Sequence, residues 1–372
     1  MGKRFGILTS GGDCPGLNAV IRGAVLKGET VYGHTFVGFR DGWRGLVYGD
    51  VLELDRSTVR GLSNQGGTIL GTSRFGPYTE PDGGPENIKK VLADLDLQGV
   101  IAIGGDGTAA AANRLFNDGI NIVGVPKTID NDIDATDYTF GFNTAVEIAT
   151  EAIDRLRTTG NSHRRCMVLE VMGRHAGWIA LHSGIAGGAH AILIPEQPES
   201  LNQICAWVTS VKNRGRSPMV VVAEGFTLPD MKEAHAVKGL DGFNRPRLGG
   251  IGEVLAPLIE ERTGIETRAT VLGHIQRGVC RAPGTGCWPP AWAWPWPISS
   301  PTAPGVTWWP CMVPRSPASP STRRSATSNR FRRTSIRRSG SSSADRRSLR
   351  PSCGRARNHQ PQRQVHQQLW PG

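Results

Sequence analysis

Short apolar runs alternate with glycine-rich turns and helical stretches along the first 278 residues. Phe5–Leu8, Val100–Ile103 and Ile122–Val125 are continuous apolar runs, which is typical of strands buried on both faces. Because a turn and a helical stretch follow each run, the order predicts an α/β fold with mostly parallel sheets and right-handed crossovers. Ligands in such folds bind beyond the carboxyl ends of the strands, where these turns fall.

The pattern ends after Gly278. Trp, Pro and Gly crowd residues 281–314, and Ser, Arg and Pro dominate the sequence from there to Gly372. Seven of the ten tryptophans lie after Gly278, and no amphipathic period runs through this part. We therefore predict irregular, disordered structure for residues 279–372.

Charge separates the same two parts of the chain. The formal net charge is +11, but residues 279–372 alone contain 15 Arg, no Lys and one acidic residue, Asp345. Residues 1–278 therefore carry a net charge of −3, as an ordinary slightly acidic enzyme does. This distribution removes the case for nucleic-acid binding by the first part. A basic nucleic-acid-binding tail is the alternative interpretation of the second part.

No targeting or membrane-spanning signal is visible. Met1 leads directly into an apolar run without a charged region and apolar core before it. No stretch approaches the ~20 apolar residues that cross a bilayer. The seven cysteines lack metal-ligand spacing and are typical of reduced thiols. We expect a cytoplasmic protein with no membrane partner.

Two glycine-rich turns suit phosphate binding. Gly11–Ala19 follows the first apolar run and opens a helical stretch, so backbone N–H groups there can face an anion. A tight turn with packing glycines is the plainer alternative. Gly104–Thr108 adds the carboxylate of Asp106, which suits a Mg²⁺ carried on phosphates. Several kinase families share this second turn.

Thr128-Ile129-Asp130-Asn131-Asp132 places two carboxylates two residues apart. If the segment is extended, both side chains project the same way. Phosphoryl transfer to a hydroxyl needs an acceptor for the proton that leaves, and a carboxylate pair supplies it. Capping of an Asx-type turn is the alternative role.

Several scattered cations suit a doubly phosphorylated product, because Arg binds phosphate through two parallel hydrogen bonds. They are Arg74, Arg165, Arg174, Arg268, His274 and Arg277. Each alone is more often a solvated surface charge.

Taken together, these motifs occur in the order and spacing of one family. The segments are Thr9-Ser10-Gly11-Gly12-Asp13, Gly66-Gly67-Thr68 with Arg74-Phe75, Gly104–Thr108, Pro126–Asp132, Glu170–Arg174, Ala223-Glu224-Gly225 and Arg268–Gly278. The chain resembles the bacterial 6-phosphofructokinases, especially the actinobacterial type, over about three-quarters of its length. The resemblance implies phosphoryl transfer to fructose 6-phosphate.

The resemblance also implies roles for single residues. Asp130 is the base for the sugar 1-hydroxyl, Asp132 supports it, and Arg174 stabilises the transferring phosphoryl group. The sugar phosphate is held by Thr128, which also belongs to the catalytic set, and by Met172, Gly173, Glu224, His274 and Arg277. Arg165 and Arg268 reach the 6-phosphate from a neighbouring subunit. The donor site is lined by Gly11, Arg74, Phe75, Gly105, Gly107 and Thr108, with Asp106 oriented toward Mg²⁺.

The family fold consists of two similar α/β lobes, assembled as a homotetramer or homodimer with shared active sites. Applied to this chain, it predicts a nucleotide-binding lobe at 1–141 and a sugar-phosphate-binding lobe at 142–275. Residues 276–278 return to the first lobe, and 279–372 form an aberrant tail. A catalytically silent regulatory subunit is an alternative, which the intact Asp130, Asp132 and Arg174 disfavour. A lipid or NAD kinase is disfavoured by the motifs around Asp130 and Arg277.

The phosphoryl donor depends on two positions. Relatives that use pyrophosphate carry an acidic residue where Gly107 stands, which obstructs a nucleotide. Lys127 points the other way, since pyrophosphate users have Lys there and many ATP enzymes have a small residue. A steric block decides more than an added cation, so we expect ATP as donor, with pyrophosphate as the alternative.

The tail has the marks of a shifted reading frame. If each codon starts at the third base of the preceding one, the codons around Trp288-Pro289 force Leu-Ala. The whole stretch then permits Asp-Arg-Val-Leu-Ala-Thr-Arg-Leu-Gly-Leu-Ala, as in the family. Trp308–Val313 permits Met-Val-Ala-Leu-His-Gly in the same frame. We therefore interpret the tail as a frameshift product and expect the chain as written to be inactive or to aggregate.

Overall fold

The computed structural model describes residues 2–79, 82–134, 136–229, 236–240, 246–248 and 250–278. The tail at 279–372, for which the sequence predicts irregular structure, lies outside the described residues. The strands form one sheet from residues 4–141, the first lobe, and another from residues 166–271, the second lobe.

The first lobe is built on a six-stranded sheet with the order β3-β2-β1-β4-β5-β6. Its strands are β1 (Arg4–Thr9), β2 (Thr35–Phe39), β3 (Val51–Leu54), β4 (Val100–Gly104), β5 (Ile122–Thr128) and β6 (Phe140–Gly141). Neighbouring strands are parallel except β2 and β3. Because β1, β4 and β5 are adjacent and parallel, the turns that follow them lie at one edge of the sheet.

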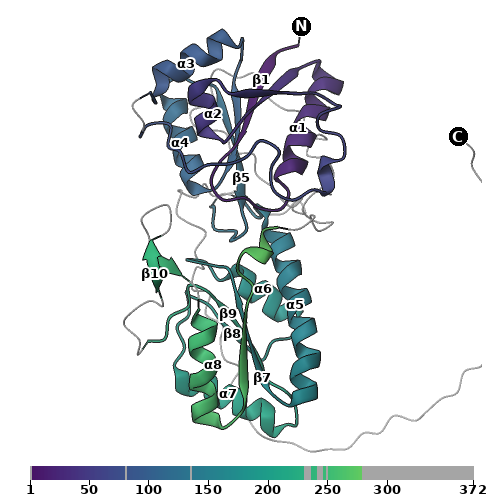
Figure 1. Cartoon of the computed structure of the whole chain (residues 1–372), viewed down its shortest axis with the longest axis vertical. Coiled ribbons are helices and arrows are strands. Elements are labelled where there is room, and N and C mark those ends of the chain that lie inside the picture. The colour runs from purple at the N-terminus through teal and green to yellow at the C-terminus, as the bar shows by residue number, and fades with distance from the viewer. Residues whose placement is uncertain are drawn as a thin grey trace, which may run out of the picture. The chain divides into compact units, whose positions relative to one another are not determined.

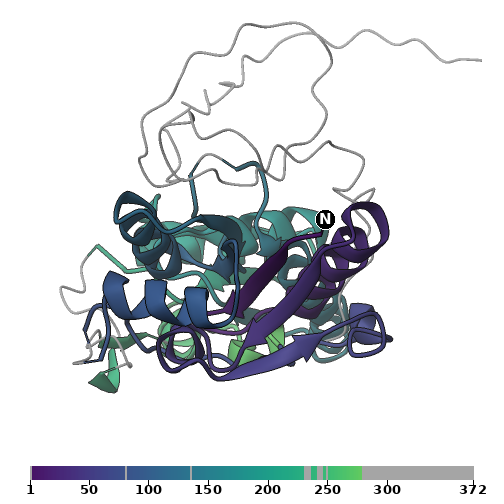
Figure 2. The same cartoon turned by 90° about the horizontal axis from the view of Figure 1, so that it is seen from above.

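Helices cover both faces of this sheet. On one face lies α1 (Leu17–Tyr32), and on the other lie α2 (Trp43–Tyr48), α3 (Pro85–Asp94) and α4 (Asp106–Asn117) (Figure 1). Leu17, Ile21 and Val25 of α1 belong to one buried cluster, while Trp43 and Leu115 belong to the other. Figure 2 shows the purple strands from above, between the purple helix α1 and the blue helices. A short 3₁₀ turn, η1 (Leu62–Asn64), precedes the Gly66–Phe75 segment.

The second lobe is built on a four-stranded parallel sheet with the order β12-β7-β9-β8. Its strands are β7 (Cys166–Val171), β8 (Ala191–Leu193), β9 (Met219–Ala223) and β12 (Thr267–Val271). Its helices are α5 (Phe142–His163) and α6 (Trp178–Ala186) on one face, and α7 (Leu201–Asn213) and α8 (Ile251–Thr263) on the other (Figure 1). The 3₁₀ turn η2 (Gly273–Gln276) follows β12, and β10 (Ala236–Leu240) pairs with β11 (Pro246–Leu248). The predicted α/β fold with mostly parallel sheets is confirmed.

One buried charge in this lobe has a structural role. Glu170 is 2% exposed in β7, where every residue is buried. Its carboxylate accepts hydrogen bonds from Gly250 N (3.0 Å) and Gly252 N (2.8 Å) at the start of α8. An anion at a helix N-terminus is stabilised by unsatisfied N–H groups and the helix dipole. Glu170 therefore joins β7 to α8 and serves the fold.

No helix among the described residues is long and apolar enough to cross a membrane.

Candidate active site

The first glycine-rich turn is joined to the segment that carries Arg74 and Phe75. Gly11 has a φ of +84°, in the region that favours glycine. Its carbonyl accepts from Thr72 Oγ1, and its N–H donates to Ser73 O (3.3 Å). The predicted donor-site residues Gly11, Arg74 and Phe75 are thus brought together.

Asn18, in the first turn of α1, secures the same segment from the other side. It is 2% exposed. Its Nδ2 donates to Gln65 O and Gly66 O, both at 3.2 Å, and its Oδ1 accepts from Ile69 N (2.9 Å). No role for Asn18 was predicted from the sequence. A buried amide in the first turn of a helix is the signal that would have pointed to it.

The second glycine-rich turn forms the start of α4. Asp106 and Gly107 are exposed there, at the positive end of a 12-residue helix. A Cβ added at Gly107 would meet nothing within 4 Å. Thr108 is only 6% exposed and packs so closely on Gly104 that a Cβ on Gly104 would lie 2.2 Å from Thr108 Oγ1. This end of α4 can therefore face an anion with Gly105, Asp106 and Gly107.

Asp130 lies just beyond β5, with its Oδ1 buried and without a hydrogen-bond partner among the described residues. Burial raises the pKa of Asp130 to about 7, and the nearby carboxylates Asp132 and Glu224 act in the same direction. Arg277 and Lys127 act against it. A buried carboxylate with an empty acceptor oxygen and a pKa near neutrality is suited to take up a proton.

The turn around Asp130 corrects one premise of the sequence analysis. Asn131 has a φ of +53°, so the segment is not extended and its carboxylates do not share a face for that reason. Asn131 Oδ1 accepts from Thr139 N (2.9 Å), and Thr139 Oγ1 donates to Thr128 O (2.6 Å). The segment is thus a turn that the Asn131 side chain joins to Thr139, and it carries two interacting carboxylates, Asp130 and Asp132.

Met172, Gly173, Arg174 and Glu224 lie together at the carboxyl ends of β7 and β9. Glu224 N donates to Val171 O (2.9 Å), and Gly225 N donates to Gly173 O (3.0 Å). A Cβ on Gly225 would lie 2.0 Å from Arg174 O, so only glycine fits there. Burial raises the pKa of Glu224, against a hydrogen bond from the Gly173 backbone that lowers it. This cluster of predicted acceptor-site residues is compact.

Two cations hold the carbonyls of the first turn. Lys127 is 4% exposed, and its Nζ donates to Gly12 O. Arg277, just after η2, donates from Nη1 to Asp13 O (2.9 Å). Burial lowers the pKa of Lys127. Because Arg277 follows the second sheet and Asp13 follows the first, this contact brings the donor-side and acceptor-side residues to one place.

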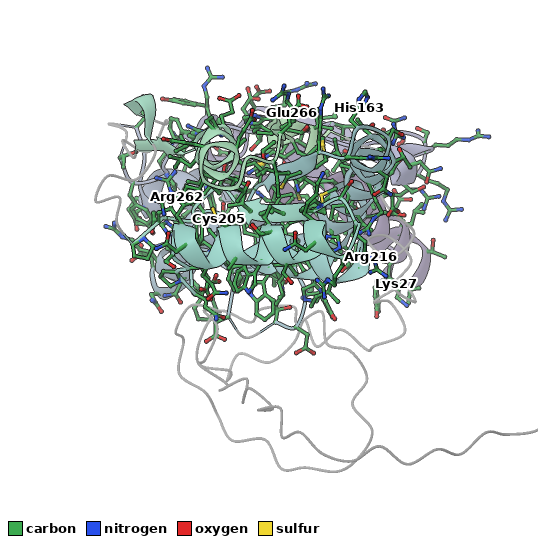
Figure 3. All side chains as sticks on the ribbon, turned by 90° about the horizontal axis from the view of Figure 1, so that it is seen from below. Lys27, His163, Cys205, Arg216, Arg262 and Glu266 are labelled. Carbon is green, nitrogen blue, oxygen red and sulfur yellow. The ribbon has the colours of Figure 1, made fainter. Side chains whose placement is uncertain are left out.

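Arg165 and Arg268 lie at the opposite end of the second sheet. Arg165 Nε pairs with Glu266 Oε2 (2.7 Å), and Arg268 pairs with the same carboxylate. Glu266 and His163 lie along the same side of the molecule in Figure 3, and both arginines and His163 help to keep the pKa of Glu266 low. Arg165 precedes β7 and Met172 follows it, so about 23 Å of strand separates them at ~3.3 Å per residue. The two arginines are therefore too far away to serve the Met172 end within one chain.

A metal ion bound among the described residues would have few protein ligands. No group of three or more His, Cys, Asp or Glu side chains that could hold a metal ion occurs among the described residues. The exposed carboxylate of Asp106 fits a Mg²⁺ that takes its other ligands from phosphate oxygens and water.

The raised pKa of Asp130 predicts a pH dependence of catalysis. We call the chain in which residues 1–278 continue in the shifted frame the frame-restored chain. If Asp130 serves as the predicted general base, it must be deprotonated to act, so kcat/KM of the frame-restored chain should fall about tenfold per pH unit below pH about 7 and level off above it. A pH–rate profile between 5 and 9, corrected for ionisation of the phosphate substrates, measures this. A profile that stays flat down to pH 5 would exclude a raised pKa.

Comparison with known proteins places these residues in a family. The sequence profile described as Phosphofructokinase matches residues 4–283. A pyrophosphate–fructose 6-phosphate 1-phosphotransferase of Streptomyces coelicolor is 58% identical over 276 residues, 74% of this chain and 80% of that protein. ATP-dependent 6-phosphofructokinase 3 of the same organism is 50% identical over 276 residues, 74% of this chain and 81% of that protein. The structure of phosphofructokinase from Saccharomyces cerevisiae matches with a TM-score of 0.66 and 30% identity, over 77% of this chain and 40% of that one.

Proposed function

The chain belongs to the phosphofructokinase family, and we propose that it transfers a phosphoryl group to the 1-hydroxyl of fructose 6-phosphate. The observation that carries this proposal is the buried, unpartnered Oδ1 of Asp130, which lies where residues from both sheets converge. A sugar hydroxyl that reaches Oδ1 supplies the missing hydrogen-bond donor. The experiment that tests it measures formation of fructose 1,6-bisphosphate by the frame-restored chain.

Asp130 acts as the general base in this proposal. Its carboxylate takes the proton of the 1-hydroxyl as the oxygen attacks the donor's terminal phosphorus. The bond from that phosphorus to the bridging oxygen breaks, and the rest of the donor, ADP or phosphate, leaves with the bonding electrons. Burial, helped by the neighbouring carboxylates, keeps the pKa of Asp130 high enough for the proton transfer at neutral pH. Asp132 supports the base by helping to raise the pKa of Asp130. Thr128 Oγ1 accepts a hydrogen bond from Asp130 N (3.1 Å), which fixes the backbone at Asp130.

Arg174 and the exposed end of α4 control charge on the transferring group. Arg174, on the tightly packed loop after β7, would stabilise the phosphoryl oxygens. Asp106 would hold Mg²⁺, which neutralises phosphate charge when it is bound. The backbone N–H groups at Gly105 and Gly107 would bind the donor phosphates.

The sugar phosphate is bound in this proposal by Met172, Gly173 and Glu224 on the sugar, and by His274 and Arg277 on the 6-phosphate. Arg165 and Arg268 would reach the 6-phosphate of a second copy of the chain, because both lie near the start of the paired strands β7 and β12, at the end away from Met172. The functional unit is then a homo-oligomer, a homodimer or homotetramer.

ATP is the donor that the open space at Gly107 supports. The second candidate is pyrophosphate, favoured by the buried Lys127 behind the first turn and by two relatives at 57–58% identity that are named pyrophosphate–fructose 6-phosphate 1-phosphotransferases. A small inorganic donor needs no space beside Gly107, whereas the rest of a nucleotide does.

Substitution at Gly107 separates the two donors. Gly107→Asp should lower kcat/KM with ATP by about 10–100-fold, because the carboxylate fills the open space that the rest of the nucleotide needs. Turnover with pyrophosphate, if present, should change less than about threefold. Gly107→Ala is the matched control and should retain ATP turnover, since its Cβ meets nothing within 4 Å. Turnover with pyrophosphate alone in the unsubstituted protein would exclude ATP as donor.

A further inference from the structure

Gln276 is a fully buried amide at the end of η2, between the predicted phosphate-binding residues His274 and Arg277. Its exposed fraction is 0%. Its Oε1 accepts a hydrogen bond of 2.7 Å from Met172 N, which lies 104 residues earlier in the chain. Its Nε2 is buried and has no partner among the described residues. A side chain held so completely inside a polar site needs an explanation.

The explanation lies in how the pairing of β7 with its neighbours ends. The last main-chain bonds at this end run from Leu272 N to Glu170 O (3.0 Å) and from Glu224 N to Val171 O (2.9 Å). After Leu272 the chain turns away at Gly273, with a φ of +49°, and enters η2. Met172 N therefore has no main-chain carbonyl of β12 beside it. The carboxamide oxygen of Gln276 occupies that place and extends the ladder by one bond.

Met172 begins the loop that carries Arg174. On its other side this loop is fixed by Gly225, where a Cβ would lie 2.0 Å from Arg174 O. Gln276 thus holds one flank of the loop and Gly225 the other. Because Arg277 follows Gln276 directly and donates to Asp13 O, the same short turn also contacts the donor side.

We propose that Gln276 is a positioning residue. It fixes the Met172–Arg174 loop relative to the Arg277 side chain, so that both are placed for phosphoryl transfer. It touches neither substrate and acts through the Met172 amide. The expected effect on kcat rests on the proposed function. The hydrogen bond from Met172 N to Gln276 Oε1 does not, because it follows from the geometry alone.

Gln276→Met tests the hydrogen bond, because it keeps the length of the side chain and removes the acceptor. Gln276→Glu is the conservative variant, since it keeps an acceptor oxygen at the same distance. Ser183→Ala is the matched control. Ser183 is also 0% exposed, and its Oγ donates to Ile179 O (2.6 Å) within α6, away from the site.

The first measurement is hydrogen exchange at Met172, in the 372-residue chain and in the frame-restored chain. In unsubstituted protein the Met172 amide should be protected, although it lies just beyond the strand. Gln276→Met should speed its exchange about tenfold or more, while Gln276→Glu and Ser183→Ala should leave it protected. Exchange at Met172 as fast as in an exposed loop, or unchanged by Gln276→Met, would overturn the proposal.

The second measurement is steady-state kinetics of the frame-restored chain. Misplacing a catalytic group by about 1 Å costs up to ~10²-fold, so Gln276→Met should lower kcat about 10–100-fold. KM for the donor should change less than about threefold, and Gln276→Glu should recover most of kcat. Equal kcat in Gln276→Met and Ser183→Ala would overturn the positioning role. Absence of activity in the unsubstituted chain, with Met172 protected, would count against the proposed function and leave the hydrogen bond established.

Discussion

Replacing Asp130 with Asn should lower kcat of the frame-restored chain by about 10²–10⁴-fold, the usual contribution of a general base. KM for fructose 6-phosphate should change little, because Asn keeps the size of the side chain and an acceptor oxygen. The physical reason is that Oδ1 of Asp130 is buried without a partner and has a raised pKa, so Asn at this position removes the group that accepts the proton in the proposed reaction.

The same substitution should stabilise the fold at alkaline pH. The pKa of Asp130 is higher in the folded protein than the ordinary value of 3.8, so the folded state binds the extra proton. Stability is therefore lost as the pH rises from about 4 to about 7, by up to roughly 4 kcal/mol at ~1.4 kcal/mol per pKa unit. Asp130→Asn removes this loss, and thermal unfolding at pH 8 and pH 5 measures the difference.

Asp154→Asn is the control, since Asp154 is exposed on α5. It should leave both kcat and unfolding at pH 8 unchanged. A loss of less than tenfold in kcat for Asp130→Asn would show that another group takes the proton.

Restoring the reading frame should convert an inactive chain into an active one. Similarity to the family profile ends at residue 283, and the Streptomyces coelicolor relative is matched over 80% of its length. Just before the proposed shift, Val271 and Ile275 are 40% and 67% exposed. In the family the following segment completes both lobes. The free energy lost without that segment should exceed a typical folding stability of about 5–15 kcal/mol.

The check compares the two chains, expressed side by side, for soluble yield, oligomeric state and product formation. We expect measurable turnover only from the frame-restored chain. A soluble, active oligomer from the 372-residue sequence as written would contradict the expectation, drawn from the frameshift hypothesis, that the altered tail inactivates the chain. Sequencing the coding DNA across codons 270–320 is the control, because a stop codon in the shifted frame before codon 320 would refute it independently.

The fold, and the positions of most candidate site residues at the ends of strands, could be predicted from the sequence because the signals for them are local. Continuous apolar runs ending in glycine-rich turns predict parallel strands, and adjacent parallel strands bring their turns to one edge. Gly11 and Gly107 follow β1 and β4 in this way, as Asp130 follows β5. The predicted roles of these residues, the lobe boundaries and the cytoplasmic location stay predictions.

What the sequence could not give depends on side chains from distant segments. The high pKa of Asp130 arises from burial together with Asp132 and Glu224, and Glu224 is far away in the chain. The condition of an extended segment at Asp130 is not met, since Asn131 has a positive φ and its side chain accepts a hydrogen bond from Thr139 N. Gln276 had no predicted role, because its partner is a backbone amide that local pattern does not mark.

Two of the predicted phosphate-binding cations form ion pairs that could not be predicted from the sequence. Arg165 and Arg268 share Glu266 at the far end of the second sheet, a pairing that follows from the register of β7 and β12. Their service to a second copy of the chain remains a proposal, which cross-complementation of Arg165 and Asp130 variants would test.

The most direct test of the central claim is a product assay with the purified frame-restored chain. Fructose 6-phosphate, Mg²⁺ and either ATP or pyrophosphate are supplied at saturating concentration, and fructose 1,6-bisphosphate is measured in parallel for Asp130→Asn. We expect product that depends on the sugar phosphate and is lost with Asp130→Asn. A folded oligomer that forms no product with either donor, or that forms it equally well without the Asp130 carboxylate, would contradict it.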